Sequence, residues 1–432
     1  MASLAPRNPA QGARKPGGRH LQACLLCALL WGMASAVWAQ DASVHATEEP
    51  EEIRVREING PIEKRIISES LRLAFYGYLD GSYVQNFNNP SNGINQLRIF
   101  DVEANQFRPN VAKLVLEREA RTDGDVSDLF GFRVKFNAGK DSEYIGGTNL
   151  SPLADFQELY AQFIFPYGNG IDIKFGRMNT LVGYESVESP WNPNFSRSWM
   201  FGLGQPFTTV GLRASYKFNE QVSFSIGGIN SITSATGDGT NDLMVEAALT
   251  VKPISRVEFT LYGLFGPRPG QTPNTGGNRV LGGGMLTYQI TNQAQVILEA
   301  YYANQANSSA LSPGKNARWD GVAGYLVYDF TEQWGIRIRG EIFEDAGGFV
   351  TCNGTETLPK ANVCFGSSPT ATSPDVAQTL WETTYTLQFR PWYSLMTRLE
   401  YRQDHSNKGV FQRGNAPSSQ QETLAFEVVY LF

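Results

Sequence analysis

The sequence of 432 residues has no long apolar run, and this absence sets the first limit on its fold. A helix that crosses a membrane needs roughly 18 or more consecutive apolar residues, and no stretch provides them. Charged residues make up only 18% and the mean hydropathy is −0.28, while aromatic residues reach 12% and glycines number 43. A sheet with one face in lipid and one in water has this composition, and so does a large soluble β-protein.

Histidine and cysteine are also scarce, with three and four residues respectively. Without the leader described below, only His45, His405, Cys352 and Cys364 remain. A Ser–His hydrolase needs a base beside its nucleophile, and the sequence pairs His405 with no particular serine. No histidine lies near the two cysteines, which favours a loop-closing disulfide in an oxidising compartment over a metal site. We therefore expect no enzyme, no cofactor and no metal.

Residues 1–39 have the features of a secretory signal peptide. Four basic residues precede an apolar stretch at about 21–33, and Val37 and Ala39 occupy the positions that signal peptidase reads. Cleavage after Ala39 leaves 32 basic and 42 acidic residues, a net charge of −10 that gives no support for nucleic-acid binding. Residues 40–70 are charged and lack sustained alternation, which predicts a flexible periplasmic segment.

From residue 71 onward, apolar and polar residues alternate in repeated segments. The segment 336–342, Ile-Arg-Ile-Arg-Gly-Glu-Ile, places its charges on one face, and 395–402 does the same. Strands that cross a membrane at a tilt near 45° need about 9 to 11 residues, which is close to the length of these segments. The alternation predicts strands with one apolar face and one polar face.

Short and long breaks follow each other in turn between the segments. Short links lie at 121–128, 166–170, 218–221, 253–256, 291–293, 331–333 and 391–394, and long polar stretches lie at 88–97, 140–154, 183–205, 232–240, 267–278, 304–316, 346–377 and 405–420. Bacterial barrels place short turns in the periplasm and long loops outside. The pattern predicts an all-β transmembrane antiparallel up-and-down barrel of sixteen strands over residues 71–432, with both chain ends in the periplasm.

The last segment has the clearest apolar face. Leu424, Phe426, Val428, Tyr430 and Phe432 alternate along it and end with the sequence. A soluble protein would leave this apolar edge exposed, which proteins usually avoid. We predict that Tyr430 and Phe432 form the signal read by the barrel-assembly machinery, and that the apolar face contacts outer-membrane lipid and lipopolysaccharide.

Three stretches resemble a known family. They are Gly-Tyr-Leu-Asp-Gly-Ser-Tyr at 77–83 with Arg-Ile-Phe-Asp at 98–101, Gly-Tyr-Glu-Ser-Val-Glu-Ser-Pro at 183–190 continuing through Asn-Phe-Ser-Arg-Ser at 194–198, and Pro-Phe-Thr at 206–208 followed by Gly-Leu-Arg-Ala-Ser-Tyr at 211–216. Together they resemble the OmpL-like family of β-barrel porins over most of 75–432, and the middle stretch is the most specific. The resemblance implies an outer-membrane porin-like channel and no particular substrate.

The loop 183–205 is the predicted pore constriction, because the third long loop of sixteen-stranded porins commonly folds into the lumen. It carries Glu185, Glu188 and Arg197 among aromatic rings and two prolines that could stiffen it. Selectivity in a porin depends on pore width and on the charge at its narrowest place. The alternative is an outer loop packed on its neighbours.

The polar faces of the predicted strands supply the opposing wall. Arg133, Lys135, Arg213 and Lys217 are assigned to the constriction, and Arg337, Arg339, Glu341, Arg398, Glu400 and Arg402 to the lumen lining. A basic wall facing an acidic loop would set a transverse field that favours charged or zwitterionic solutes. The same mixture of charges arises when lumen residues only pair with each other, and the sequence leaves both readings open.

The predicted function is an outer-membrane porin, a water-filled channel for passive diffusion of small polar solutes or ions. The long loop that holds Cys352 and Cys364 keeps an adhesin or structural barrel as the alternative. Sixteen-stranded porins are often homotrimers, but no stretch marks a trimer face, and the sequence names no solute.

Overall fold

The computed structural model describes residues 54–55, 64–68, 70–145, 151, 153–231, 243–269, 276–309, 312, 314–353, 360–366 and 377–432. The predicted signal peptide and most of the predicted segment 40–70 lie outside these residues. Among the helices of the described residues, none has the length and apolar character needed to cross a membrane.

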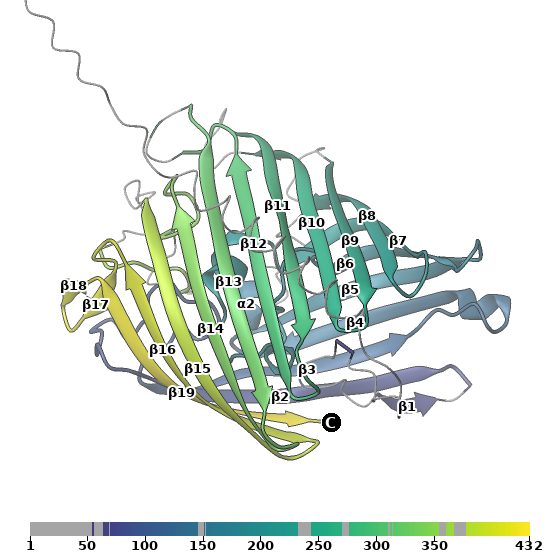
Figure 1. The fold of residues 1–432 in the computed structure, drawn as a ribbon, viewed down its shortest axis with the longest axis horizontal. Coiled ribbons are helices and arrows are strands. Elements are labelled where there is room, and N and C mark those ends of the chain that lie inside the picture. The colour runs from purple at the N-terminus through teal and green to yellow at the C-terminus, as the bar shows by residue number, and fades with distance from the viewer. Residues whose placement is uncertain are drawn as a thin grey trace, which may run out of the picture. The chain divides into compact units, whose positions relative to one another are not determined.

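Sixteen of the seventeen strands in the main sheet form a closed antiparallel ring (Figure 1). In chain order they are β2 (Leu73–Asn86), β3 (Gln106–Arg118), β4 (Phe130–Ala138), β5 (Ala154–Phe165), β6 (Ile171–Asn179), β7 (Thr208–Lys217), β8 (Val222–Ser231), β9 (Met244–Ile254), β10 (Val257–Pro269), β11 (Gly276–Gln289), β12 (Ala294–Gln305), β13 (Ala317–Asp329), β14 (Trp334–Asp345), β15 (Gln378–Trp392), β16 (Leu395–Ser406) and β19 (Gln420–Leu431). Each pairs with the next, and β19 pairs with β2. The predicted sixteen-stranded barrel is confirmed.

The remaining strand, β1 (Arg65–Ser68), pairs with β2 at the closing seam. Its residues belong to the segment predicted to be flexible, and here they extend the sheet instead. Smaller elements lie in the connections: η1 (Val126–Leu129), α2 (Ser142–Ile145), η2 (Ser189–Trp191), α3 (Trp199–Gly204), and the hairpin of β17 (Phe411–Arg413) and β18 (Ala416–Ser418).

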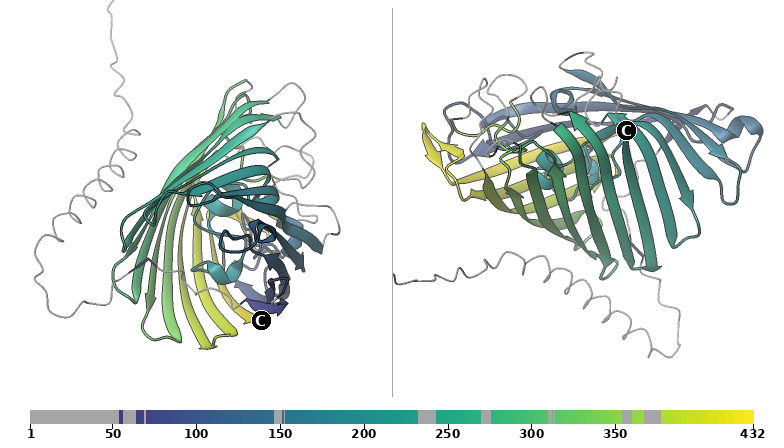
Figure 2. Two further views of the ribbon diagram at one scale, coloured as in Figure 1. Left: turned by 90° about the vertical axis from the view of Figure 1, so that its right-hand side faces the viewer. Right: turned by 90° about the horizontal axis from the view of Figure 1, so that it is seen from above.

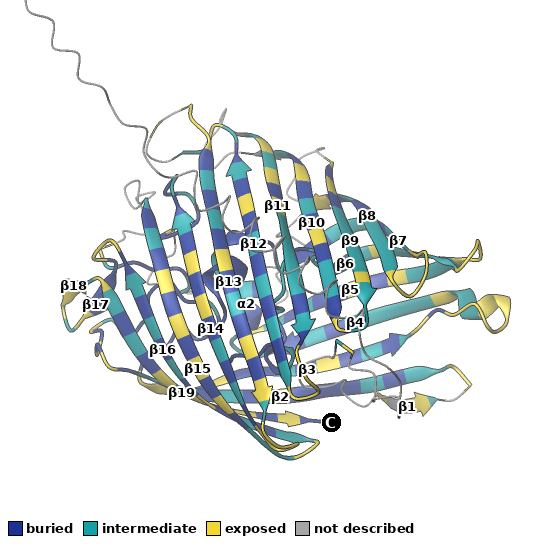
Figure 3. Ribbon diagram, in the orientation of Figure 1, coloured by how far each residue is buried: buried dark blue, intermediate teal, exposed yellow. Residues whose placement is uncertain are grey.

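Side chains alternate between the two faces of the wall, because successive residues of a strand point to opposite sides. On β15, Trp381, Tyr385 and Leu387 are exposed on the outer face, whereas Glu382 and Thr384 are buried on the inner face. Figure 3 shows this banding along β14 and β15. An outward apolar face is what a barrel needs to meet lipid.

Three of the short turns are built by the same local device. In the turns after β11 and β13, the hydroxyl oxygens of Thr291 and Thr331 each accept hydrogen bonds from the backbone N–H groups two and three residues further on. In the turn after β7, Asn219 does the same through its side-chain oxygen. Short polar side chains that bind the backbone in this way favour tight turns, which is why these links are short.

The inner face of the barrel is apolar over part of its area, which differs from the polar lumen expected from the sequence. Tyr301, Trp319, Tyr325 and Phe343, on β12 to β14, are buried and form one core cluster. The same cluster includes Trp199 and Met200 of α3. Short helical turns lie within the curved wall of strands in Figure 2 (left). The chain therefore packs part of its third long loop into the barrel.

Candidate pore constriction

The loop 183–205 enters the barrel and is held by the carboxylate of Glu341 on β14. The backbone N–H groups of Trp199 and Met200 donate to Glu341 Oε2 and Oε1 at 2.7 and 2.6 Å. These are the first residues of α3, where backbone N–H groups lack partners within the helix and favour an anion. Ser198 caps the same end, since its hydroxyl accepts from the Phe201 N–H at 3.1 Å. Glu341 of the wall and Ser198 of the loop together thus stabilise the N-terminus of α3.

The far end of α3 lies very close to the wall. Trp319 Nε1 donates to the Gly204 carbonyl at 2.8 Å, and the Tyr301 hydroxyl donates to the Met200 carbonyl at 2.9 Å. A Cβ atom at Gly204 would lie 1.6 Å from the Tyr301 hydroxyl. Only glycine allows this approach.

Side chains of β16 fix the earlier part of the loop. Glu400 accepts hydrogen bonds from the backbone N–H groups of Phe195 and Ser196 at 2.7 and 2.9 Å. Arg398 donates to the carbonyl oxygens of Ser189 and Asn192, at 3.1 and 2.9 Å. Charged wall groups therefore hold the loop by its backbone, largely independent of its side chains.

Glu185 lies in a buried ion-pair network between the loop and the wall. Arg339 Nη1 is 2.8 Å from Glu185, and Arg339 Nε is 2.5 Å from Glu382 on β15. All three side chains have an exposed fraction of 0%, and the Ser198 N–H also donates to Glu185. Glu185 therefore anchors the loop and does not face water.

Glu188 is the second acidic residue predicted in the constriction, and it contacts the opposite wall. Its carboxylate is 2.5 Å from Lys135 Nζ and 3.6 Å from Lys113 Nζ, and it accepts from Gln157 Nε2 at 2.9 Å. Burial alone would raise the pKa of Glu188, but Lys113 and Lys135 hold that pKa well below its ordinary value. Glu188 therefore bridges the loop to β4.

The other predicted constriction residues occupy three different settings. Arg197 braces the loop internally, donating to the carbonyl of Val187 at 2.6 Å. Arg213 pairs with Glu246 at 2.8 Å on the inner wall, and Lys217 pairs with Glu220 in an exposed turn. Arg133 lies 2.6 Å from Glu117 and 3.6 Å from Glu158, which also binds Lys135. The structure thus brings Glu188, Lys135 and Arg133 together and leaves Lys217 apart.

The six residues predicted to line the lumen point inward, but the loop covers them. Arg337, Arg339, Glu341, Arg398, Glu400 and Arg402 each have an exposed fraction of 3% or less. They do not line an open water column, so this assignment is corrected. The alternation identified the correct face and could not reveal that the loop would fill the space in front of it.

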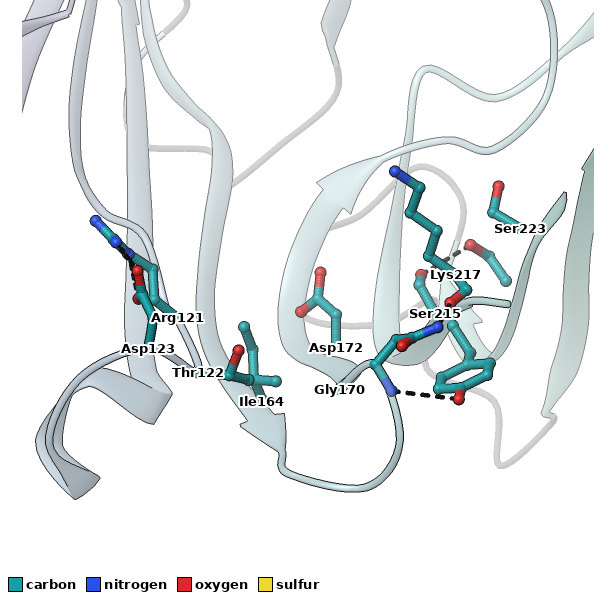
Figure 4. Close-up of a pocket in the computed structure, with 12 residues that line it drawn as sticks. Arg121, Thr122, Asp123, Ile164, Gly170, Asp172, Ser215, Lys217 and Ser223 are labelled. Atoms are coloured by element: carbon teal, nitrogen blue, oxygen red, sulfur yellow. Dashed lines mark hydrogen bonds and ion pairs between the residues drawn. The ribbon is translucent and has the colours of Figure 1, made fainter. Parts of the chain in front are cut away.

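The inner faces of β14 to β16 and β19 are called the covered half below, and those of β5 to β9 the open half. In the open half a cavity of about 620 Å³ lies near the short turns, lined by residues that include Asp172, Ser215, Lys217 and Ser225. Figure 4 shows Asp172 and Ser215 on neighbouring strands of this cavity. The hydroxyl oxygens of Ser215 and Ser225 are 2.7 Å apart. The end of this half near the short turns is therefore polar and accessible to water, whereas Arg213 and Glu246 further along its inner face are buried.

Contacts between three long loops lie above the constriction at the opposite end from the short turns. Cys352 and Cys364 form a disulfide with a Cα–Cα distance of 4.9 Å. The Leu97 N–H donates to the Val363 carbonyl at 2.9 Å, and the Phe365 N–H donates to the Val410 carbonyl at 2.7 Å. Arg98 pairs with Asp404, near the end of β16, at 2.7 Å. Leu97 also accepts from Trp199 Nε1 at 3.0 Å, which links these loops to α3.

Lys113, which lies 3.6 Å from Glu188, is a residue of this site that was not predicted from the sequence. Lys113 and Glu117 lie on one face of β3 by simple alternation, so the sequence pattern could have predicted that they face inward.

Within its described residues, the structure contains no group of three or more histidine, cysteine or acidic residues suited to a metal ion.

A closed ring of sixteen strands with an inserted third loop defines the porin class of β-barrel. Residues 72–432 match the family described as "Putative beta-barrel porin-2, OmpL-like", and the chain belongs to this family. The predicted family and the predicted porin channel are thereby confirmed. No curated protein matches the chain.

Solved porin structures share the fold at low sequence identity. The chain is similar to the outer membrane channel DcaP of Acinetobacter baumannii, with 11% identity, a TM-score of 0.53 and coverage of 84% of this chain and 99% of that one. It is similar to an anion-selective porin from Comamonas acidovorans, with 7% identity, a TM-score of 0.53 and coverage of 83% and 99%. It is also similar to Salmonella typhi OmpF in complex with daunomycin, with 14% identity, a TM-score of 0.53 and coverage of 84% of this chain and 98% of that one.

Proposed function

We propose that the protein is a bacterial outer-membrane porin that passes small polar solutes and ions by passive diffusion, along the open half of its lumen. The observation that carries this proposal is the difference in access between the two halves. Charged groups of the covered half are sealed beneath the loop, whereas Asp172 and Lys174 in the open half each keep 29% of their side chain exposed. A hydrated path along exposed polar groups suits small hydrophilic solutes.

Glu188 with Lys135 and Arg133 of β4, the strand next to the open half, forms the narrow place of this path in the proposal. Lys135 pairs with both Glu188 and Glu158 at 2.5 Å, so the loop and the wall meet there through ion pairs. Opposite charges on two sides of a narrow water path produce a transverse field on a permeating solute.

Planar-bilayer recording of the purified protein tests the channel. We expect stable ion-conducting steps, and deletion of residues 189–198 should raise the single-channel conductance because it removes the inserted loop. Heat-denatured protein serves as the control. A folded barrel that conducts no ions would contradict the proposal and favour the adhesin or structural barrel, for which the linked outer loops around Cys352 and Cys364 provide the observation.

In this proposal the protein is a channel and not a hydrolase. The ring of His405 stacks on Trp381 with a centroid distance of 5.5 Å, and Trp381 lies on the outer face of the wall. A histidine in that position has no access to the lumen. Absence of esterase turnover in the conducting preparation, unchanged by His405→Ala, is the expected result.

The same proposal places the protein in the bacterial outer membrane. Exposed apolar residues such as Leu399, Phe426 and Tyr430 would contact outer-membrane lipid and lipopolysaccharide, with the short turns in the periplasm. Tyr430 and Phe432 would be read by the barrel-assembly machinery, and residues 1–39 would be removed as a signal peptide. We also propose a homotrimer, and native mass spectrometry of the detergent-extracted protein tests it: a monomer would contradict it.

A further inference from the structure

A second cavity, of about 420 Å³, lies between the loop 183–205 and the wall formed by β2 to β4. Its wall side includes Tyr76, Tyr78 and Arg133, and its loop side includes Glu188 and Trp191. Volumes of this size are typical of sites for small molecules. The cavity adjoins the proposed narrow place, so a permeating solute would pass it.

The charged groups in and behind the lining of this cavity differ in their exposure to water. Side chains of Lys64, Arg133 and Lys135 keep 38%, 26% and 10% of their surface exposed. The acids that bind Arg133 and Lys135 keep only 2% (Glu117) and 6% (Glu158 and Glu188), whereas Glu119, which also binds Lys64, keeps 63%. Arg133 and Lys135 are therefore more exposed to the water of the cavity than the carboxylates that bind them, and these carboxylates limit the net charge.

Aromatic rings form the other part of the lining. The rings of Tyr78 and Trp191 have centroids 6.0 Å apart with an interplanar angle of 60°, and Tyr76 lies on the same strand as Tyr78. Tilted aromatic rings at this distance offer faces and edges to a further ring. The Tyr76 hydroxyl donates to Glu117 at 3.2 Å, which fixes that ring beside the cations.

We propose that this cavity is a binding site for small aromatic carboxylates. The carboxylate meets Lys135 and the Nη1 group of Arg133, since Nε and Nη2 of Arg133 already bind Glu117. The ring of the solute packs against Tyr76 and Trp191. The inference rests on the proposed channel function and adds a solute class to it. The buried acids keep the binding weak enough for release, as permeation requires.

Current block in planar bilayers with benzoate, acetate and benzylammonium as probes tests the site. Benzoate should reduce the current at a concentration about tenfold below that of acetate, because stacking adds to the charged contact. Benzylammonium should block at no lower concentration than acetate. Equal block by benzoate and acetate, or stronger block by benzylammonium, would overturn the proposal.

Two variants test separately how the cation of Arg133 and the aromatic ring of Trp191 contribute to benzoate binding. Arg133→Gln should raise the half-blocking concentration of benzoate about tenfold, and Trp191→Leu should raise it about threefold while leaving acetate unchanged. Lys252→Gln is the matched control, since Lys252 pairs with Glu258 at 2.8 Å on β9 and β10, away from this cavity. Heat-modifiable mobility on unboiled gels verifies that each variant is folded. Block that is insensitive to both Arg133→Gln and Trp191→Leu would also overturn the proposal.

Calorimetric titration of benzoate into the detergent-solubilised wild-type barrel separates this inference from the channel. Benzoate binding without any conductance would refute the channel and support the site. Conductance without benzoate binding or block would refute the site alone.

Discussion

The covered half and the open half of the inner wall use the same residue types for different purposes. In the covered half, Arg339, Arg398 and Arg402 are 1% exposed or less and bind the loop or its acids. In the open half, Lys174 and Asp172 are 3.4 Å apart with 29% of each side chain exposed. Charges removed from water interact strongly and lose much hydration, whereas wet charges interact weakly. The arginines beside the inserted loop therefore hold the structure, whereas the Lys174–Asp172 pair near the short turns stays in contact with water.

Breaking the central ion pair of the covered half should have the largest effect. Arg339→Leu removes the buried cation that Glu185 and Glu382 share and leaves only Arg402, at 3.8 Å, beside Glu382. The loss costs about 3 to 5 kcal/mol of unfolding free energy. Urea unfolding of the folded barrel, followed by gel mobility, measures it. The open-half control Lys174→Gln should change stability by roughly 0 to 1 kcal/mol. Equal effects of the two changes would remove the distinction between the halves.

The disulfide tests whether the outer loops help to hold the covered half. Closing a ring of this length stabilises by about 3 kcal/mol in the loop-entropy model, and the bond lies in the core cluster that includes Trp199. Cys352→Ser with Cys364→Ser should lower stability and increase the noise of the open-channel current. Thiol labelling of denatured, unreduced wild-type protein should find both cysteines blocked, and two reactive thiols would contradict the bond.

A smaller effect is expected at Glu400, a wall carboxylate that holds the loop by its backbone N–H groups. Glu400→Gln replaces one of two accepting oxygens with an N–H₂ group facing the backbone donors of Phe195 and Ser196, at a cost of about 1 to 3 kcal/mol. Hydrogen exchange of those two amides should accelerate. Unchanged exchange would indicate that the loop is held without Glu400.

The two loop acids should respond differently, because only Glu188 lies beside the proposed path. Glu188→Gln leaves Lys135 and Lys113 with less acidic charge beside the path, so the reversal potential should shift toward anions. Glu185→Gln should mainly lower stability, because Glu185 has no access to the path. A selectivity shift in Glu185→Gln as large as that in Glu188→Gln would contradict this assignment.

The pH dependence of Glu188 follows from the direction of its pKa shift. Because the folded-state pKa lies well below 4.5, the Glu188–Lys135 pair contributes fully above the ordinary carboxylate pKa and is lost as the pH falls through the lowered value. Unfolding measured between pH 7 and pH 3 should show a steeper acid loss in the wild type than in Glu188→Gln. Glu220→Gln, in an exposed turn, is the control.

Much of the fold could be predicted because the ring depends on local patterns. Turn residues such as Thr291 and Thr331 act within three positions, and period-two alternation is visible in the sequence itself. The inner wall at β13 could not be predicted in the same way. Tyr325 and Val327 face inward while Val322 and Leu326 face outward, so both faces are apolar and alternation carries no signal there.

The candidate site was predictable in its residues more than in their access to water. The sequence points to Glu185, Glu188 and Lys135 as charged groups of the constriction. It cannot show that Glu185 meets Arg339, which lies 154 residues later in the chain. Burial depends on such pairings between distant segments, and no local pattern encodes them.

The short strand β1 has a consequence for how the ring closes. The N–H of Phe432 donates to the Gly77 carbonyl at 3.0 Å, and the next positions along that edge of β2, Phe75 and Ala74, pair with Arg65 and Ile66. A slip of the closing strand by two residues would keep its side chains on the same faces, so the sidedness of the side chains alone does not prevent it. With β1 in place, such a slip would meet a strand that already occupies those positions. β1 therefore blocks this slip and helps to set the register between β19 and β2.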